Sequence, residues 1–269
     1  MLKLYLEDIS TIQNESSAMT EKYYYEQRKY AKEYLIPYFE KYIPQFRSFK
    51  VLEVGCAEAG FIEELLELGM SVTGIELNSQ RVEVALQKNP KLDLHVGDIT
   101  KPELALQFKE KYNLIVMREV IEHLPNKVNA FMNITDLLNE DGYLFVSFPP
   151  KFSPFAGHQQ VGRTFFKFTP YIHLLPFGFM KKMSELLHEN KGYAEHLKLH
   201  YETGMAIKAF DRLRKDYGFK VVHKDLFIFR PIYGLRYGLP KIKFPNLPVA
   251  RELLSFGYEA LLQKSAKNF

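Results

Sequence analysis

The sequence is poor in several features that define other classes of protein. It has one cysteine, Cys56, which excludes an internal disulfide and fits a reducing compartment. A formal charge of +4 over 269 residues is too small to indicate a nucleic-acid-binding protein. No uncharged apolar run reaches the roughly 18 residues that a membrane helix needs, and the first residues lack the pattern of a signal peptide. We therefore expect a cytoplasmic protein without a transmembrane segment.

What the sequence does contain is an alternation of short apolar runs and helical stretches. With 46% hydrophobic and 25% charged residues, the chain has enough apolar side chains for a large core. Continuous apolar strands separated by helices predict a parallel sheet covered on both faces. The expected strands are Lys50–Val54, Ser71–Ile75, Leu92–Val96, Tyr112–Met117 and Tyr143–Phe148, and the expected helices lie near 21–42, 60–68, 79–88, 102–109 and 127–139.

The pattern breaks after the fifth strand. Pro149–Tyr193 is rich in Phe, Pro and Gly and shows no clear period, which is typical of a functional lid. Regular structure returns with a helix at 203–216, for which Thr203 is the expected N-cap, and a strand at Phe219–Phe229. The stretch "LLSFGYEALLQK" near the end favours a last strand antiparallel to that one.

These elements predict an α/β fold: a Rossmann-like, seven-stranded, mostly parallel sheet with an antiparallel last strand and helices on both faces. A lid is inserted after strand five. The expected division is an N-terminal helical segment capping the site (1–49), a cofactor-binding core (50–150), the lid or substrate subdomain (151–202), and a C-terminal helix and strand pair that complete the core (203–269).

The first strand runs into a loop that is short of glycine. In "VLEVGCAEAG" only Gly55 and Gly60 remain, and Ala57 and Ala59 stand at the other two positions where a phosphate-binding loop carries glycine. About twenty residues further on, Glu76 ends the second strand, where a carboxylate can accept hydrogen bonds from both ribose hydroxyls. These features leave a dinucleotide and S-adenosylmethionine both open.

Three further features favour one of the two. Glu53 lies inside the first strand, Asp98 follows the third strand in "HVGDIT", and the fourth strand runs into "MREVIEHLPN". Together with Glu76, these motifs resemble the class I S-adenosylmethionine-dependent methyltransferases. That family has an acidic residue in "E-x-G-x-G-x-G", an acid after strand two, "G-D" after strand three and "D-V-I-E-H-L" after strand four. The resemblance spans roughly Val51–Pro149 and the terminal strand pair.

The resemblance implies a set of cofactor contacts. Glu53 and Gly55 would lie by the methionine end, Glu76 would bind the ribose, and Asp98 and Ile99 the adenine. The full set of cofactor-binding residues that we predict is Glu53, Gly55, Cys56, Ala57, Gly60, Glu76, Leu77, Asp98, Ile99, Arg118 and Glu119. The chain departs from the family at Ala57, Ala59 and Glu119, where the family often has glycine, glycine and aspartate. A methionine moiety has no pyrophosphate, so these alanines favour S-adenosylmethionine over NAD.

Among the candidate catalytic residues, His158 is the first choice. It follows the fifth strand, and a neutral imidazole there could take the proton of an attacking hydroxyl. The alternative is a histidine that only hydrogen-bonds the lid. His123, beside Glu122, is a second candidate for proton transfer, although in the similar family this pair mainly supports its loop. Cys56 is interpreted chiefly as a small buried residue. His173, His188, His196 and His200 lack metal-ligand spacing with carboxylates or thiols, so no metal is expected.

The acceptor is where the sequence says least. Tyr25 and Arg28 on the first helix and Gln159 and Arg163 in the lid are candidate substrate residues. We expect a small-molecule acceptor and no nucleic acid. The first hypothesis is O-methylation of a sugar or glycan precursor. The alternatives are a lipid-like or quinone-type acceptor and a non-catalytic S-adenosylmethionine-binding protein. Basic residues between 230 and 251 could instead face phosphates or an anionic membrane, as a peripheral contact. Nothing in the sequence indicates the oligomeric state.

Overall fold

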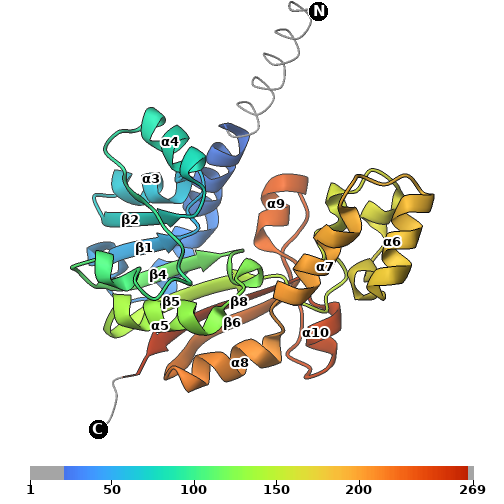
Figure 1. The fold of residues 1–269 in the computed structure, drawn as a ribbon. Coiled ribbons are helices and arrows are strands. Elements are labelled where there is room, and N and C mark those ends of the chain that lie inside the picture. The colour runs from blue at the N-terminus through green and yellow to red at the C-terminus, as the bar shows by residue number, and fades with distance from the viewer. Residues whose placement is uncertain (1–20, 266–269) are drawn as a thin grey trace, which may run out of the picture. The chain divides into compact units, whose positions relative to one another are not determined.

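The computed structural model describes residues 21–265 and divides the chain into two compact units, with the boundary between Asp98 and Ile99 (Figure 1). Among the described residues, the first unit holds three strands and the second holds five. The predicted Rossmann-like α/β class with antiparallel C-terminal strands is therefore confirmed. The strand count is one higher than predicted, because a two-residue strand, β7 (Ile242–Lys243), pairs with the edge strand β6 (Phe219–Phe229).

The first unit opens with the expected helix, in which residues 21–30 continue through a π-helical turn, η1 (Ala31–Leu35), into α2 (Ile36–Tyr42). Its parallel strands are β1 (Lys50–Val54), β2 (Ser71–Glu76) and β3 (Asp93–Val96), in the order β3-β2-β1. They alternate with α3 (Gly60–Glu67) and α4 (Ser79–Lys88). Short 3₁₀ turns lie at η2 (Phe46–Ser48) here and at η3 (Ala105–Gln107) and η4 (Ile121–His123) in the second unit.

Local chemistry explains where the helices of the first unit begin and how they pack. The Asn78 side chain caps α4 by accepting from the amides of Gln80 and Arg81. Gly74 leaves room on β2, since a Cβ there would lie 2.5 Å from Ile62 Cδ1 of α3 and 2.8 Å from the Cys56 sulfur. The glycine therefore lets α3 and the loop after β1 pack directly on the sheet.

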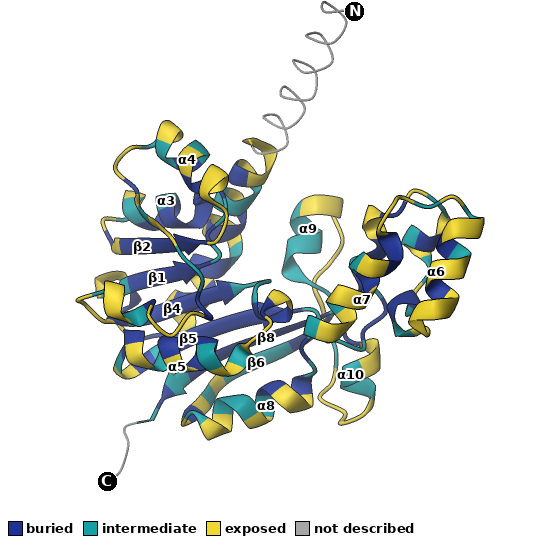
Figure 2. Cartoon of the chain, viewed as in Figure 1, coloured by how far each residue is buried: buried dark blue, intermediate teal, exposed yellow. Residues whose placement is uncertain are grey.

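The sheet of the second unit runs β4-β5-β8-β6-β7. In addition to β6 and β7, this sheet contains β4 (Tyr112–Arg118), β5 (Leu138–Phe148) and β8 (Gly257–Lys264). The β4 and β5 pair is parallel, whereas β8 is antiparallel to both β5 and β6. The helices α5 (Lys127–Leu137) and α8 (Ile207–Asp216) contribute Phe131 and Phe210, whose rings contact each other, and Phe210 also contacts Phe148 and Tyr258. Figure 2 colours the strands β4 and β5 mostly as buried. Two short helices, α9 (Pro231–Tyr237) and α10 (Ala250–Leu254), lie between β6 and β8 in the sequence.

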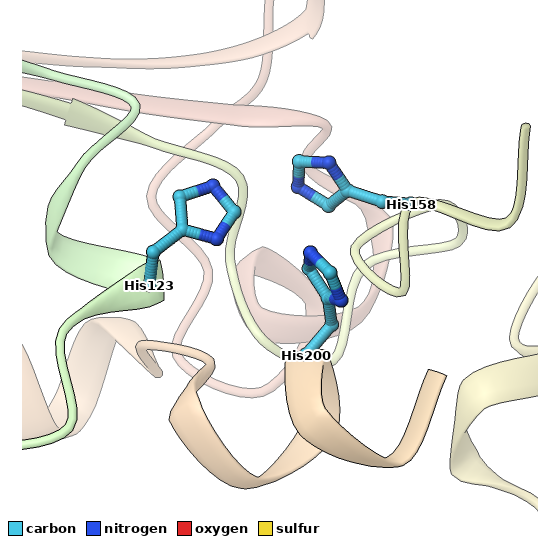
Figure 3. A group of neighbouring side chains, drawn as sticks. All are labelled: His123, His158 and His200. Carbon is cyan, nitrogen blue, oxygen red and sulfur yellow. The ribbon is translucent and has the colours of Figure 1, made fainter. Parts of the chain in front are cut away.

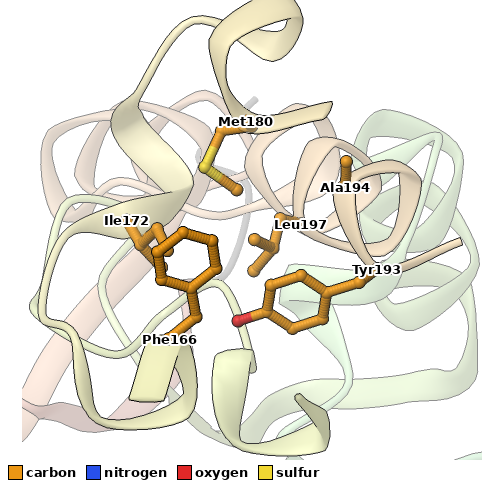
Figure 4. Close-up of a cluster of buried hydrophobic side chains, with 6 residues drawn as sticks. All are labelled: Phe166, Ile172, Met180, Tyr193, Ala194 and Leu197. Atoms are coloured by element: carbon orange, nitrogen blue, oxygen red, sulfur yellow. The ribbon is translucent and has the colours of Figure 1, made fainter. Parts of the chain in front are cut away.

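The predicted lid is a helical segment with a core of its own. Three 3₁₀ turns, η5 (Gln159–Val161), η6 (Phe165–Phe168) and η7 (Ile172–Leu174), precede α6 (Phe177–Leu186) and α7 (Tyr193–Thr203). Figure 4 shows the side chains that form this core: Phe166, Ile172, Met180, Tyr193, Ala194 and Leu197. Met183 and Leu187 are partly buried and pack against it. The stretch without a clear period thus folds by burying an apolar cluster rather than by repeating a pattern.

Two predicted elements are wrong. Residues 102–109 form only η3 instead of a helix, because Leu104 alone of this stretch is well buried while Leu106 is 86% exposed, so no apolar face exists. Thr203 is the last residue of α7 and not the N-cap of the next helix, which begins at Ile207. Its hydroxyl bonds back to the Leu199 carbonyl within α7. In the described part of the chain, every helix is too short or too polar to cross a bilayer.

Candidate active site

The loop between β1 and α3 has the backbone of a glycine loop although it contains alanine. The φ angles of Gly55, Ala57 and Ala59 are +73°, +49° and +61°, all in the left-handed region. An L-residue with a Cβ is less stable there than glycine by about 1–2 kcal/mol. The two alanines that depart from the family pattern therefore keep the loop conformation that glycine would favour.

Glu76, at the carboxyl end of β2, fixes this loop. Its side chain is 9% exposed, and its two oxygens accept from the Ala57 amide and the Asn78 amide, each at 2.9 Å. A carboxylate has about four lone-pair positions, so two stay available to donors from a ligand. Glu76 is thus held in place at the carboxyl end of a parallel strand, where ligands bind in sheets of this kind, and it can still accept hydrogen bonds from hydroxyl groups.

Glu53 and Cys56 are buried beside this carboxylate. Glu53 on β1 is 1% exposed, and the amides of Gly55 and Cys56 both donate to the Ile75 carbonyl. Burial, with the nearby charges of Glu53 and Glu76, raises the pKa of the Cys56 thiol well above its usual range. The thiol therefore stays protonated, which agrees with its interpretation as a small packing residue.

Gly60 and Arg28 both take part in the contact between the first helix and α3. A Cβ on Gly60 would lie 2.5 Å from the Tyr24 carbonyl oxygen, and the Gly60 amide donates to the Gln27 side chain at 2.9 Å. Arg28 donates to Glu64 at 2.6 Å and to Glu67 at 2.5 Å, both on α3. The guanidinium that we expected at the substrate therefore clamps the first helix onto α3. Tyr25 is 57% exposed, and its predicted role stays a prediction.

Three other predicted cofactor residues lie at the ends of strands. Leu77 follows β2 and is 70% exposed, which leaves an apolar surface for a flat ring. Asp98 follows β3, and Ile99 begins the second unit and is 3% exposed. The Asn133 side chain of α5, which no sequence motif pointed to, donates to the Ile99 carbonyl at 2.8 Å and holds that turn in place.

In the second unit, Glu119 is held by a basic residue that the sequence did not single out. Glu119 follows Arg118, the last residue of β4, and has a φ of +54°. Its carboxylate accepts from Arg230 at 2.5 Å and from the Ser147 hydroxyl at 3.0 Å. Burial of the carboxyl opposes ionisation, but the attraction of Arg230 outweighs it and lowers the pKa.

Two of the basic residues between 230 and 251, Arg230 and Arg251, are largely buried and do not belong to a basic surface. Arg230 is 13% exposed in its side chain and crosses Gly257, where a Cβ would lie 2.6 Å from the Arg230 Cγ. Lys243 pairs with Asp225 at 2.7 Å and Arg251 with Asp211 at 3.1 Å. Arg230 and Arg251 thus serve internal ion pairs, whereas the side chain of Lys243 is 54% exposed. An anionic partner for the exposed basic residues of this stretch stays a prediction.

Three histidines from distant parts of the second unit converge (Figure 3). His123 comes from η4 after β4, His158 from the loop after β5, and His200 from α7. Each ring offers a nitrogen, and the three nitrogens all lie within 4.8 Å of one another. The spacing in the sequence gave no sign of His200 as a member of this group.

The cluster lowers the basicity of two of its members, His158 and His123. Burial and the nearby His200 and His123 rings lower the pKa of His158 to about 3. The pKa of His123 is lowered as well, first by burial and then by His200. Near neutral pH both rings are therefore uncharged, which leaves nitrogen lone pairs available.

Glu122, beside His123, is a buried acid. Its side chain is 4% exposed, and neither carboxylate oxygen has a hydrogen-bond partner among the described residues. Burial and the charge of Glu119 raise its pKa well above the usual range. The nearest histidine nitrogen, Nε2 of His123, lies 3.8 Å from one of its oxygens.

The two predicted substrate residues of the lid differ in their surroundings. Gln159 is fully buried, and its amide nitrogen donates to the carbonyls of Pro154 and Thr169 at 2.8 and 3.0 Å. Both hydrogens are used within the lid, so no donor is left to orient a substrate. Arg163 is exposed, and its backbone amide donates to Glu189.

Comparison with known proteins shows the family. A family model described as a methyltransferase domain matches residues 24–224, so the chain belongs to that family. A ubiquinone biosynthesis O-methyltransferase of Glaesserella parasuis serovar 5 (strain SH0165) is 35% identical over 104 residues, which are 36% of this chain and 44% of that protein. The match thus covers less than half the length of this relative.

Solved structures share the fold at low sequence identity. The PH0226 protein from Pyrococcus horikoshii OT3 has a TM-score of 0.55 at 15% identity, covering 87% of this chain and 89% of that one. A SAM dependent methyltransferase from Archaeoglobus fulgidus has a TM-score of 0.52 at 15% identity, covering 87% and 94%. The predicted class, S-adenosylmethionine-dependent methyltransferase of class I, is confirmed, and with it the predicted cofactor.

Proposed function

We propose that this methyltransferase transfers the methyl group of S-adenosylmethionine to an oxygen of a small acceptor with a quinone-type, largely apolar body. The observation that carries methyl transfer is the Glu76 carboxylate, anchored on the Ala57 and Asn78 amides at the end of β2. In this proposal Glu76 accepts from the ribose hydroxyls. Glu53 and the loop Gly55–Gly60 face the methionine end, Leu77, Asp98 and Ile99 the adenine, and Arg118 and Glu119 complete the site.

The reaction asks the protein for position and for removal of one proton. An acceptor oxygen attacks the methyl carbon as the carbon–sulfur bond breaks, and S-adenosylhomocysteine leaves. Positive charge on sulfur is neutralised in that step, so a site that excludes water and aligns the two reactants supplies much of the rate. The hydroxyl proton needs an acceptor, and the histidine cluster after β4 and β5 is our candidate, with His158 as its proposed base and His123 second.

Two observations favour a quinone-type acceptor over a sugar. Curated relatives that match 36–38% of this chain carry the name ubiquinone biosynthesis O-methyltransferase. The lid also leaves phenylalanines in solvent: Phe165, Phe168 and Phe179 are 60%, 71% and 54% exposed. Exposed aromatic side chains of this kind suit contact with an apolar molecule or a lipid surface.

The experiment is a methyl-transfer assay with a labelled methyl donor and a panel of acceptors. We expect label in a hydroxylated benzoquinone or catechol with a prenyl tail, and more of it with the tail than without. Label found instead in a nucleotide sugar would overturn the quinone-type acceptor and favour the glycan hypothesis. A chain that binds S-adenosylhomocysteine but labels nothing, either in the panel or in a whole-cell extract, would be a non-catalytic binder.

The exposed phenylalanines give this test a matched pair of variants. Replacing Phe165 and Phe168 by serine should lower turnover of the tailed acceptor several-fold while the tail-less acceptor is unaffected. Replacing the exposed Leu106 by serine, far along the chain from the lid, is the control and should change neither rate. Equal turnover of both acceptors by all three proteins would contradict a role of the lid in holding an apolar tail.

A further inference from the structure

The group His123, His158 and His200 has the donor set of a metal site. Imidazole nitrogen is a ligand that Zn²⁺, Co²⁺, Ni²⁺ and Fe²⁺ all accept, and three histidines with an open fourth position form a known type of zinc site. A tetrahedral ion with bonds of 2.0–2.1 Å needs its ligand nitrogens about 3.4 Å apart. The nitrogens here lie within 4.8 Å of one another, a spread that small side-chain rotations would close.

The second nitrogen of one ring is already engaged as metal sites require. Nδ1 of His200 lies 2.8 Å from the carbonyl oxygen of His196, one turn earlier on α7. Donation to that carbonyl fixes the tautomer and leaves Nε2 of His200 with its lone pair directed elsewhere. Metal-binding histidines commonly donate their other N–H to a carbonyl in this way, which orients the ring.

The surroundings also favour a cation. The carboxylate of Glu119 and the buried carboxyl of Glu122 flank the group, and the Glu122 side chain reaches within 3.8 Å of His123. Glu122 has no hydrogen-bond partner among the described residues, although it is 4% exposed. A buried polar side chain without a partner calls for an explanation, and a bound ion nearby is one. A dication at the three nitrogens would supply it.

We propose that His123, His158 and His200 bind a divalent transition-metal ion, Zn²⁺ in the first place, with the fourth coordination position open. The ligand expected in that position is an oxygen of the methyl acceptor, a part of the inference that rests on the proposed function. A coordinated hydroxyl loses its proton to solvent more readily, and its oxygen then attacks the methyl carbon. His158 acts in that state as a ligand and not as a free base.

The test uses the full chain without an affinity tag, stripped with a chelator and dialysed. Titration with Co²⁺ should give one equivalent with the strong visible absorption of a tetrahedral ion, and Zn²⁺ should displace it. In His158→Ala and His200→Ala the Zn²⁺ affinity should fall by at least about 100-fold, because these changes remove a direct ligand. The matched control is His188→Asn, an exposed histidine at a φ of +52° where asparagine is tolerated, and it should bind as the parent does.

Folding and function are checked on the same samples. Circular dichroism reports whether each variant folds, and His200→Gln, which keeps most of the side-chain volume, replaces the alanine variant if that one does not. Unchanged Zn²⁺ affinity in His158→Ala and His200→Gln, or the absence of the tetrahedral Co²⁺ spectrum, would overturn the site. S-adenosylhomocysteine binding is measured separately by calorimetry, so failure of the metal site leaves the methyltransferase proposal intact. Metal binding with no effect of chelation on turnover would overturn the role of the open position.

Discussion

Ala59 shows how a single residue can determine the conformation of the loop between β1 and α3. It is fully buried, has a φ of +61° and stands immediately before α3. Its Cβ is unfavourable in that conformation, whereas glycine would lose more freedom on folding. The two effects oppose each other, and for a left-handed residue the first is the larger.

We expect Ala59→Gly to raise the free energy of unfolding by about 0.5–1 kcal/mol. The change in the free energy of unfolding is measured by urea denaturation. The control is Ala85→Gly, an equally buried alanine inside α4 with ordinary helical geometry, which should be destabilising by about 1 kcal/mol. Equal destabilisation by both changes would show that the left-handed conformation of Ala59 is not a source of strain.

Glu76 stabilises the loop after β1 and is also the residue that we expect to bind the cofactor. Its oxygens accept from two loop amides and keep lone pairs, which the proposed function assigns to the ribose hydroxyls. Hydrogen bonds to a charged group contribute about 1.5–3 kcal/mol each. Glu76→Gln should therefore weaken S-adenosylhomocysteine binding by 10- to 100-fold in calorimetry, as the amide cannot accept on both sides. Glu83→Gln, on the exposed face of α4, is the matched control. Parent-like affinity in Glu76→Gln would remove this residue from the cofactor site.

At the scale of elements, the first helix is docked by close backbone contact. The absence of a Cβ on Gly60 lets the start of α3 approach Tyr24 and Arg28. Gly60→Ala places a methyl group 2.5 Å from a carbonyl oxygen, and such overpacking costs about 1–3 kcal/mol. We expect a lower unfolding midpoint and faster hydrogen exchange in residues 21–42. Gly178→Ala, at a helical position with open space around it, should be neutral or slightly stabilising.

The lid is an element whose order depends on a few buried side chains. Leu197 on α7 is 1% exposed and lies at the centre of the cluster in Figure 4. Leu197→Ala should cost about 2–5 kcal/mol of local stability. Hydrogen exchange should speed up in α6 and α7 while the strands β4 and β5 keep their protection. The control on the same helix is Leu199→Ala, since Leu199 is 55% exposed. Loss of protection throughout both strands would show that the lid core is not an independent unit.

At the scale of the whole molecule, the sequence predicted the sheet far better than the lid or the histidine cluster. Strands such as Lys50–Val54 were predicted to the residue, because a buried parallel strand is a continuous apolar run that can be seen locally. The acids Glu53 and Glu76 could be placed for the same reason, since each lies near the carboxyl end of a strand. The elements and residues that depend on a local sequence pattern could therefore be predicted without the structure.

The lid core, the histidine cluster and the Arg230 ion pair depend on contacts between segments that are distant in the sequence. The lid folds around a cluster that extends from Phe166 to Leu197 without a helical or strand period. His123, His158 and His200 come together only through the packing of a loop, a turn and a helix, so no spacing could reveal them. Arg230 was similarly mistaken for a surface charge, because its partner Glu119 lies 111 positions earlier in the chain (230 minus 119).

The pH dependence of global stability gives a test on the whole molecule through Lys127. Its ammonium donates to the carbonyls of Leu124 and Thr203, at 2.8 and 2.5 Å, and burial lowers its pKa to about 8. In the unfolded chain the pKa is about 10.4. Between these values the unfolded state binds more protons, so the contribution of Lys127 to stability rises with pH and is lost as pH falls through about 8. The parent should therefore gain stability from pH 7.5 to 9.5 relative to Lys127→Met, measured by urea midpoints.

The control is Lys29→Met, at a lysine that is 59% exposed, and its stability should change with pH as that of the parent does over this range. If Lys127→Met and the parent run parallel, the ammonium is not held in a desolvated state.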